Sequence, residues 1–202
     1  MIAKEQFESG YTYSEYRNLV DSEFENGRTT GSNQGEDYLQ YTKMNIHRMN
    51  RLEKTIDLDD ELIGKLNALP CNVNWLLITE AWCGDAAQNV PILNKMAEVS
   101  PKINLRLLLR DENLDIMDQY LTNGGRAIPK LIILDGDMNE IATWGPRPTE
   151  VQEMVMENKR TDNLPYSEFG KVVQKWYATD KGKSLQHEMM SIITRMNCIL
   201  DE

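Results

Sequence analysis

Between residues 73 and 160, short apolar runs alternate with segments of helical pattern, and this alternation limits the possible fold more than any other feature of the sequence. The first run, Val73 to Thr79, has the length and composition of a strand that is buried on both faces. The predicted elements are a strand at 73–79, a helix at 84–100, a strand at 103–109, a short helix near 114–121, strands at 130–134 and 140–144 joined by a hairpin turn, and a helix after Gly145. This order predicts an α/β fold in which helices flank a mixed four-stranded sheet.

Helical segments precede and follow this core. Helices are predicted at 14–25, 36–54 and 59–69, and Pro70 ends the last of them. Residues 167–200 have the pattern of one or two helices with a weak point at Asp180-Lys181-Gly182. Met189, Met190 and Met196 in this tail are expected to pack in the core, and a partner-binding groove is the alternative. We therefore divide the chain into a helical N-terminal extension (1–69), a core domain (70–160) and a helical C-terminal extension (161–202).

The composition argues against two classes of partner. The chain has 22 lysine and arginine residues against 32 acidic residues, which gives a net charge of -10. Nucleic acids and anionic membrane surfaces attract excess positive charge, so neither is an expected partner. No apolar run approaches the roughly 18 residues of a membrane span, and the N-terminus lacks a secretory pattern, so we expect a cytoplasmic protein. Three cysteines, Cys71, Cys83 and Cys198, are an odd number and are expected to be free thiols in a reducing compartment.

One of these cysteines stands in the sequence EAWCGDAAQ, directly after the first strand. Trp82-Cys83-Gly84 lies at the strand-to-helix junction, Pro91 follows Cys83 by eight residues, Ile128-Pro129 opens a later strand, and Gly145 lies sixteen residues beyond Pro129. In these spacings the chain resembles the thioredoxin superfamily over about residues 70 to 160. The resemblance implies a thioredoxin-like fold, a helix kinked at Pro91, and a cis peptide at Ile128-Pro129 that faces Cys83 and borders a groove for an extended substrate.

Three further segments, LRLLLRDEN, NGGRAIPKLI and TWGPRP, together with WCGDAAQ, look like an uncharacterised thioredoxin-like family with a helical N-terminal extension. Two positions depart from the dithiol members of the superfamily. Ala86 stands where the second cysteine would be, and Leu77 stands where those proteins carry a buried aspartate. Cys83 therefore cannot be resolved within its own motif. Cys71 lies on the order of 25 Å away along an extended strand, far beyond disulfide reach, and the position of Cys198 does not follow from the sequence.

The reactivity of Cys83 is predicted from two opposing effects. A helix N-terminus favours a thiolate by about 0.3 to 2 kcal/mol, and Asp85, two residues away, opposes it by about 0.5 to 1.4 kcal/mol. The two effects nearly cancel, so the sequence predicts a moderately reactive thiol with a pKa of roughly 7 to 8.5.

Three arginines, Arg110, Arg126 and Arg147, are expected around the rim of this site, because their loops border the cysteine in a thioredoxin-like arrangement. Together they would suit an anionic group, such as the carboxylate of a low-molecular-weight thiol. The alternative is that each arginine pairs with a neighbouring acid, for which Asp111, Glu112 and Glu150 are candidates. No metal site is expected, since the two histidines share no ligand spacing with the cysteines, and no cofactor is expected.

Three functions remain open from the sequence. The first is monothiol exchange, in which Cys83 attacks a disulfide-containing protein or the mixed disulfide of a low-molecular-weight thiol, and an external thiol resolves the intermediate. The second is a redox-inactive thioredoxin-fold module that binds a protein or peptide beside Pro129. The third is a sensor cysteine that is oxidised or capped. In the first function Cys83 is catalytic, and the residues expected to bind the substrate are Trp82, Gly84, Asp85, Ile128, Pro129, Arg126 and Arg147.

Overall fold

The computed structural model describes residues 2–200, except for the side chains of Tyr166 and of residues 197–200. Its centre is a sheet of four strands, β1 (Val73–Thr79), β2 (Ile103–Leu109), β3 (Lys130–Leu134) and β4 (Glu140–Trp144), in the order β2-β1-β3-β4. β2 lies parallel to β1, whereas β3 is antiparallel to β1 and β4 is antiparallel to β3. The strands have the bounds that the sequence predicts, and the α/β fold with a mixed four-stranded sheet is confirmed.

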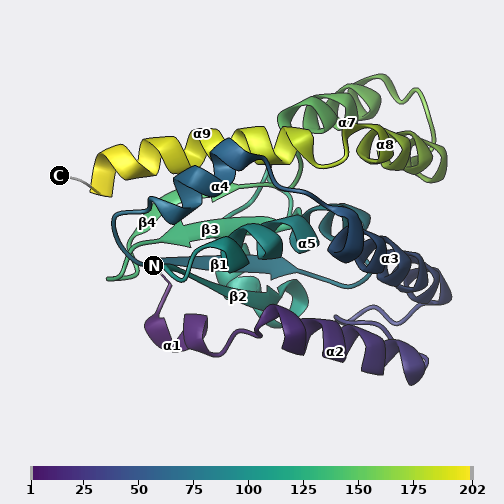
Figure 1. Ribbon diagram of the computed structural model, residues 1–202. Helices are drawn as coiled ribbons and strands as arrows, with labels where there is room; N and C mark the ends of the chain where they lie inside the picture. Colours follow the sequence, from purple (N-terminus) through teal and green to yellow (C-terminus); the bar gives the residue numbers. More distant parts are fainter. Residues whose placement is uncertain (1, 201–202) are drawn as a thin grey trace.

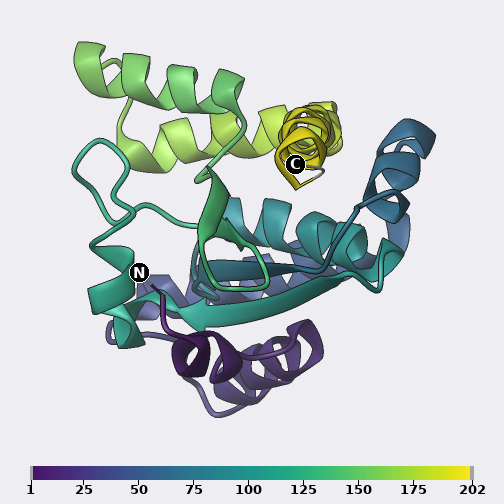
Figure 2. The ribbon, with the colours of Figure 1, turned by 90° about the vertical axis from the view of Figure 1, so that its left-hand side faces the viewer.

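Helices cover both faces of the sheet (Figure 1), and the view in Figure 2 shows the layers from one end. α1 and α2 lie on one face, whereas α4, α5 and α9 lie on the other. The helices are α1 (Lys4–Glu8), α2 (Tyr13–Glu25), α3 (Glu36–Thr55), α4 (Asp60–Asn67), α5 (Gly84–Val99), the 3-10 helix η1 (Arg110–Glu112), α6 (Leu114–Met117), α7 (Thr149–Thr161), α8 (Tyr166–Asp180) and α9 (Lys183–Leu200). The N-terminal segment also extends the sheet, because Tyr11 exchanges two backbone hydrogen bonds of 2.8 Å with Leu107 on β2.

Several helices differ from the sequence prediction: the 3-10 helix η1 was not predicted, and α4 ends at Asn67, two residues before its predicted end. α1 was not predicted, and its five residues are too few to show a helical period. The short helix predicted near 114–121 ends at Met117, because the next backbone N–H groups, those of Gln119 and Tyr120, bond to carbonyls three residues back and begin a tighter turn.

The C-terminal tail forms two helices, and the break falls at the predicted weak point. Lys181 and Gly182 both have positive φ values, 56° and 77°. A Cβ atom at Gly182 would lie 2.6 Å from Cδ1 of Ile92, so a larger residue in this turn would require Ile92 to shift as well as a strained backbone. Met189 and Ile193 on α9 are fully buried in the main core. Core packing is therefore confirmed for this helix, and the alternative of a partner-binding groove is wrong.

The buried apolar residues that the structure describes form two separate clusters. The main core surrounds the sheet and includes residues of all four strands and of α3, α5 and α9. A second, small cluster joins α7 to α8 through Val151, Val155, Val173 and Tyr177. The α7–α8 hairpin therefore has apolar packing of its own.

No helix within residues 2–200 is long and apolar enough to cross a membrane.

Candidate functional site

Cys83 lies where β1 passes into α5, as the sequence predicts. It is the N-cap residue of α5, and its Sγ accepts a hydrogen bond of 3.4 Å from the backbone N–H of Ala86. The peptide bond between Ile128 and Pro129 is cis, and the Cys83 thiol donates a hydrogen bond of 3.2 Å to the Ile128 carbonyl. The fold thus brings together three of the predicted site residues, Cys83, Ile128 and Pro129, from segments that are 45 residues apart in the chain.

The environment of Cys83 is closed. The residue is 8% exposed, and Ile128 and Pro129 beside it are also buried. Burial raises the pKa of the Cys83 thiol to about 12, and Asp85 adds to this rise, whereas the backbone N–H groups of Ala86 and Asp85 and the Arg147 guanidinium only partly offset it. The sequence prediction of a pKa between 7 and 8.5 is therefore wrong. It included the helix N-terminus and Asp85 but not the loss of water around the thiol, which is the largest effect.

The N-terminal extension covers the turn before Cys83. Asn45 of α3 donates from Nδ2 to the Ala81 carbonyl at 2.8 Å, and the Thr30 hydroxyl accepts from the Ala81 amide at 2.8 Å. The ring of Tyr38 packs edge-on against Trp82, with 5.2 Å between the ring centroids. Because Asn45 and Thr30 are themselves buried, this side of the turn is held by groups that are shielded from water.

The C-terminal extension covers the first turns of α5. Tyr177 of α8 donates from its hydroxyl to Oδ1 of Asp85 at 2.9 Å and accepts from Nδ2 of Asn89 at 3.1 Å. Gln174 accepts from Nε2 of Gln88 at 2.8 Å and donates to the Gly84 carbonyl at 3.5 Å. The turn that carries Cys83 is therefore enclosed between α3 and α8.

Asp85 and Arg147 form a mostly buried ion pair rather than two separate binding groups. The Arg147 guanidinium lies 2.7 Å from Oδ2 of Asp85 and donates to Oε1 of Gln152 at 2.9 Å. The side chains of Arg147 and Asp85 are 19% and 12% exposed. Burial raises the pKa of the Asp85 carboxyl, and Arg147 and Tyr177 oppose this rise. Arg147 therefore neutralises the Asp85 carboxylate of the protein itself.

The other two rim arginines are also paired with acids. Arg126 makes two contacts with Asp118, of 2.6 and 2.8 Å, at an exposed position. Arg110 pairs with Asp111 at 2.7 Å, and its guanidinium lies 4.7 Å from the centre of the half-buried Trp82 ring. The structure therefore favours the alternative in which each arginine pairs with an acid. Asp111 was among the candidates, whereas Asp85 and Asp118 were not.

Several residues of the site were not predicted, and Glu80 is the most unusual of them. Its side chain is fully buried, and its Oε1 accepts from the Asp111 amide at 2.9 Å. Burial raises the pKa of Glu80 to about 7. The only signal in the sequence is an acidic residue directly after a buried strand. Tyr177 and Asn45 carry no local signal, because their roles depend on how the two extensions pack.

The structure groups no metal ligands at this site. Among the residues that it describes, no group of three histidine, cysteine, aspartate or glutamate side chains could hold a metal ion. Cys71 is a half-buried free thiol, Cys83 is a buried one, and the side chain of Cys198 lies outside the described residues.

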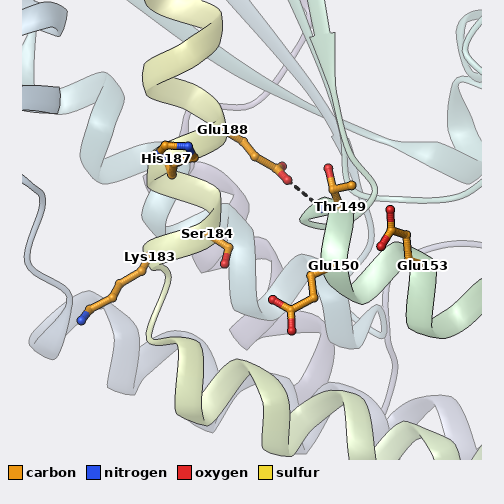
Figure 3. A pocket seen from close by; sticks show the side chains of 7 residues that line it. All are labelled: Thr149, Glu150, Glu153, Lys183, Ser184, His187 and Glu188. Carbon is orange, nitrogen blue, oxygen red and sulfur yellow. Dashed lines mark hydrogen bonds between the residues drawn. The ribbon is translucent and has the colours of Figure 1, made fainter.

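A shallow depression of about 510 Å³ lies elsewhere, between the starts of α7 and α9 (Figure 3). Glu188 closes one side of it by accepting from the Thr149 amide at 2.7 Å, and none of the predicted site residues lines it.

Two solved structures are similar to the chain over nearly its whole length. PA1234 from Pseudomonas aeruginosa, described as a protein of unknown function, has a TM-score of 0.61 and 19% identity, and the match covers 96% of this chain and 98% of that protein. An HIV epitope-scaffold has a TM-score of 0.57 and 17% identity, covering 100% of this chain and 98% of the scaffold. At such identities the likeness shows the fold alone.

The sequence itself gives a more specific result. No curated protein matches it. A family model described as thioredoxin matches residues 31–162, which is more than half of the chain and includes α3, the Cys83 turn and the cis-proline loop. The chain belongs to the thioredoxin family.

Proposed function

We propose that this protein is a redox-inactive thioredoxin-fold module that binds a protein or peptide partner, and that Cys83 serves as a packing residue. One observation carries the proposal: the Cys83 thiol is 8% exposed, lies between two helical extensions and donates its proton to the Ile128 carbonyl. Exchange requires a thiolate that can reach a disulfide. With a pKa of about 12, only about one thiol in 10⁵ is ionised at neutral pH.

The surroundings of Cys83 support the same conclusion. Ala86 provides a backbone N–H to the sulfur but no second thiol, and Leu77 is fully buried in β1 where the dithiol enzymes carry a proton acceptor. Arg126 and Arg147, which would orient an anionic thiol substrate, are each neutralised by an aspartate. The chain thus keeps the shape of the thioredoxin site without the groups that exchange needs.

The partner would bind beside Pro129, where the resemblance to thioredoxins implies a groove; Ile128 and Pro129 are buried in the described conformation, so this groove must open for the partner to bind. In the described conformation the Ile128 carbonyl is already bonded to Cys83, so an extended peptide must displace that thiol to pair with the backbone. A phage-displayed library of random peptides, selected on the immobilised protein, tests this function. The selected peptides should bind a Cys83→Ala variant at least as tightly as the wild type, because the variant has no thiol to displace from the Ile128 carbonyl. Failure to select any peptide, or binding that needs the thiol, would contradict the proposal.

Monothiol exchange through Cys83, with a disulfide-containing protein or a low-molecular-weight thiol as partner, is the second candidate. One observation favours it: the contacts between α8 and α5 are hydrogen bonds of polar side chains. If α8 moved away from α5, water could replace these hydrogen bonds. Oxidised glutathione separates the two candidates. We expect no mixed disulfide on Cys83 in the native protein at neutral pH, with the half-buried Cys71 as reference in the same peptide map. A mixed disulfide that forms on Cys83 at least as fast as on Cys71 would contradict the packing role of Cys83 and favour a thiol function, exchange or a capped sensor, instead.

A further inference from the structure

The two helical covers of the Cys83 turn are attached in different ways. α3 contributes Met49 and Leu52 to the main core, so its removal would expose apolar surface around the sheet. The α7–α8 hairpin buries its apolar residues in its own cluster, of which Val151, Val155 and Val173 are members. Figures 1 and 2 show this hairpin beside the sheet layers rather than within them. The hairpin can therefore move as one body with its apolar cluster intact.

Among the residues of the hairpin whose side chains the structure describes, Tyr177 and Gln174 form its hydrogen bonds to α5. Tyr177 bonds to Asp85 and Asn89, and Gln174 bonds to Gln88 and the Gly84 carbonyl. Each of these polar groups can bond to water instead when the surfaces separate, so the net cost of separation is smaller than the number of bonds suggests. The strongest contact is that between the Tyr177 hydroxyl and the Asp85 carboxylate, because hydrogen bonds to charged groups are the strong ones.

Both ends of the hairpin are turns that contain a glycine. Gly145, just before α7, and Gly182, just after α8, have positive φ values of 110° and 77°. The first of these turns lies on the cis-proline loop, since a Cβ atom at Gly145 would be 2.3 Å from the Pro129 carbonyl oxygen. The same turn carries Arg147, which pairs with Asp85 beneath α8. Movement of the hairpin would thus uncover Asp85, the neighbouring Cys83 and the edge of the Pro129 groove together.

We propose that the α7–α8 hairpin is a lid that swings away from α5 about the turns at 145–148 and 181–182, and that the Tyr177 hydroxyl is the latch that holds it closed on Asp85. The lid rests on the proposed function in one respect, because it would control access to the groove beside Pro129. Opening of the lid is measured by the alkylation of Cys83 and by the hydrogen exchange of backbone amides. These measurements test the lid whether or not a peptide binds.

The test compares two variants that lose the same chemical group. Tyr177→Phe removes the latch hydroxyl but keeps the ring in its apolar cluster, and Asp85 keeps Arg147 as a partner. Tyr13→Phe removes the hydroxyl that donates to Oε1 of Glu53 at 2.6 Å, and Glu53 keeps Arg17 as a partner at 2.7 Å. Tyr13 lies on α2, so its loss weakens the N-terminal helices without touching the hairpin.

The first readout is the rate at which iodoacetamide alkylates Cys83, followed by peptide mapping with Cys71 as reference. Tyr177→Phe should raise this rate about 10- to 100-fold, the range that corresponds to loss of one hydrogen bond to a charged group. Tyr13→Phe should leave it within about twofold of the wild type. Equal rates in the two variants would overturn the lid, because exposure would then follow general loss of stability.

Amide hydrogen exchange supplies the second readout. In the lid mechanism, Tyr177→Phe accelerates exchange in α8 and in the first turn of α5, and leaves β1 and β3 at wild-type rates. Exchange that accelerates equally in α8 and the sheet would mean global unfolding and would overturn the proposal. Faster exchange in α8 without faster alkylation would also overturn it, since the hairpin would then not control access to Cys83.

Discussion

Replacing Glu80 with glutamine should remove most of the pH dependence of stability between about pH 5 and pH 8. The Glu80 side chain is fully buried after the end of β1, and its Oε1 accepts from the Asp111 amide. Burial raises the pKa of Glu80 from 4.5 to about 7, and the nearby Asp111 carboxylate adds to the rise, whereas Arg110 opposes it. Burial raises the pKa of Asp111, but hydrogen bonds from Ser32 and Arg110 outweigh burial, and the net effect is a lowered pKa. Asp111 therefore stays ionised throughout this pH range.

The sign follows from which state holds the proton more tightly. The folded pKa of Glu80 lies above the unfolded value, so the folded state binds the proton more strongly. The stability that this proton contributes is fully present below about pH 4.5 and is lost as the pH rises through about 7. The difference between the two pKa values corresponds to about 3 kcal/mol at 1.36 kcal/mol for each pH unit. Glu80→Gln should therefore match the wild type near pH 4 and exceed it by about 1 kcal/mol near pH 5 and by up to about 3 kcal/mol near pH 8.

Urea unfolding, followed by tryptophan fluorescence at several pH values, measures this effect. Glutamine keeps an oxygen for the Asp111 amide, so the variant preserves the local hydrogen bond while it removes the charge. Glu112→Gln is the control, because this neighbouring carboxyl is exposed and its replacement should leave the pH profile unchanged. If the difference between Glu80→Gln and the wild type stays constant from about pH 5 to pH 8, Glu80 does not titrate in this range and the reasoning from burial is refuted.

Two other substitutions probe the fold and the closed site. Gly182→Ala should lower the free energy of unfolding by about 1 to 3 kcal/mol, because Gly182 has a positive φ and an added Cβ would contact Ile92. Gly170→Ala, at a position with open space within α8, should raise the free energy of unfolding by about 0.5 to 1 kcal/mol. The same urea titration measures both. Ala86→Cys restores the second cysteine of a dithiol motif, yet the variant should not reduce insulin in a turbidity assay, because Cys83 stays buried. Activity in Ala86→Cys would show that the missing thiol, and not the closed site, keeps the wild type inactive.

The fold could be predicted largely from the sequence, because its strands and helices follow local patterns. The runs at Val73–Thr79 and Lys130–Leu134 are mostly apolar segments between turn residues, and the structure gives both the predicted bounds. Asp180-Lys181-Gly182 breaks the tail into two helices because a glycine there has no helical preference and can adopt a positive φ. Cys83 at the start of α5 was likewise predicted correctly, since a strand followed by a helix fixes the position of the residue between them.

The reactivity of the site could not be predicted in the same way. The reactivity of the Cys83 thiol depends on whether water surrounds it. Water is excluded by Asn45, which lies 38 residues earlier in the chain, and by Gln174 and Tyr177 of α8, which lie more than 90 residues later. The partner of Arg147 is Asp85, which is 62 residues away and was not a candidate from sequence spacing.

The sequence by itself determined the secondary structure, the order of strands and helices along the chain and the place of Cys83 at a helix N-terminus. Each of these depends on residue type and on the spacing of near neighbours. Only the tertiary structure decided that the thiol is buried, that its pKa rises to about 12 and that the rim arginines are paired within the chain. Burial and charge pairing depend on distances in space between segments that are remote in sequence, and the local pattern of a segment does not contain those distances.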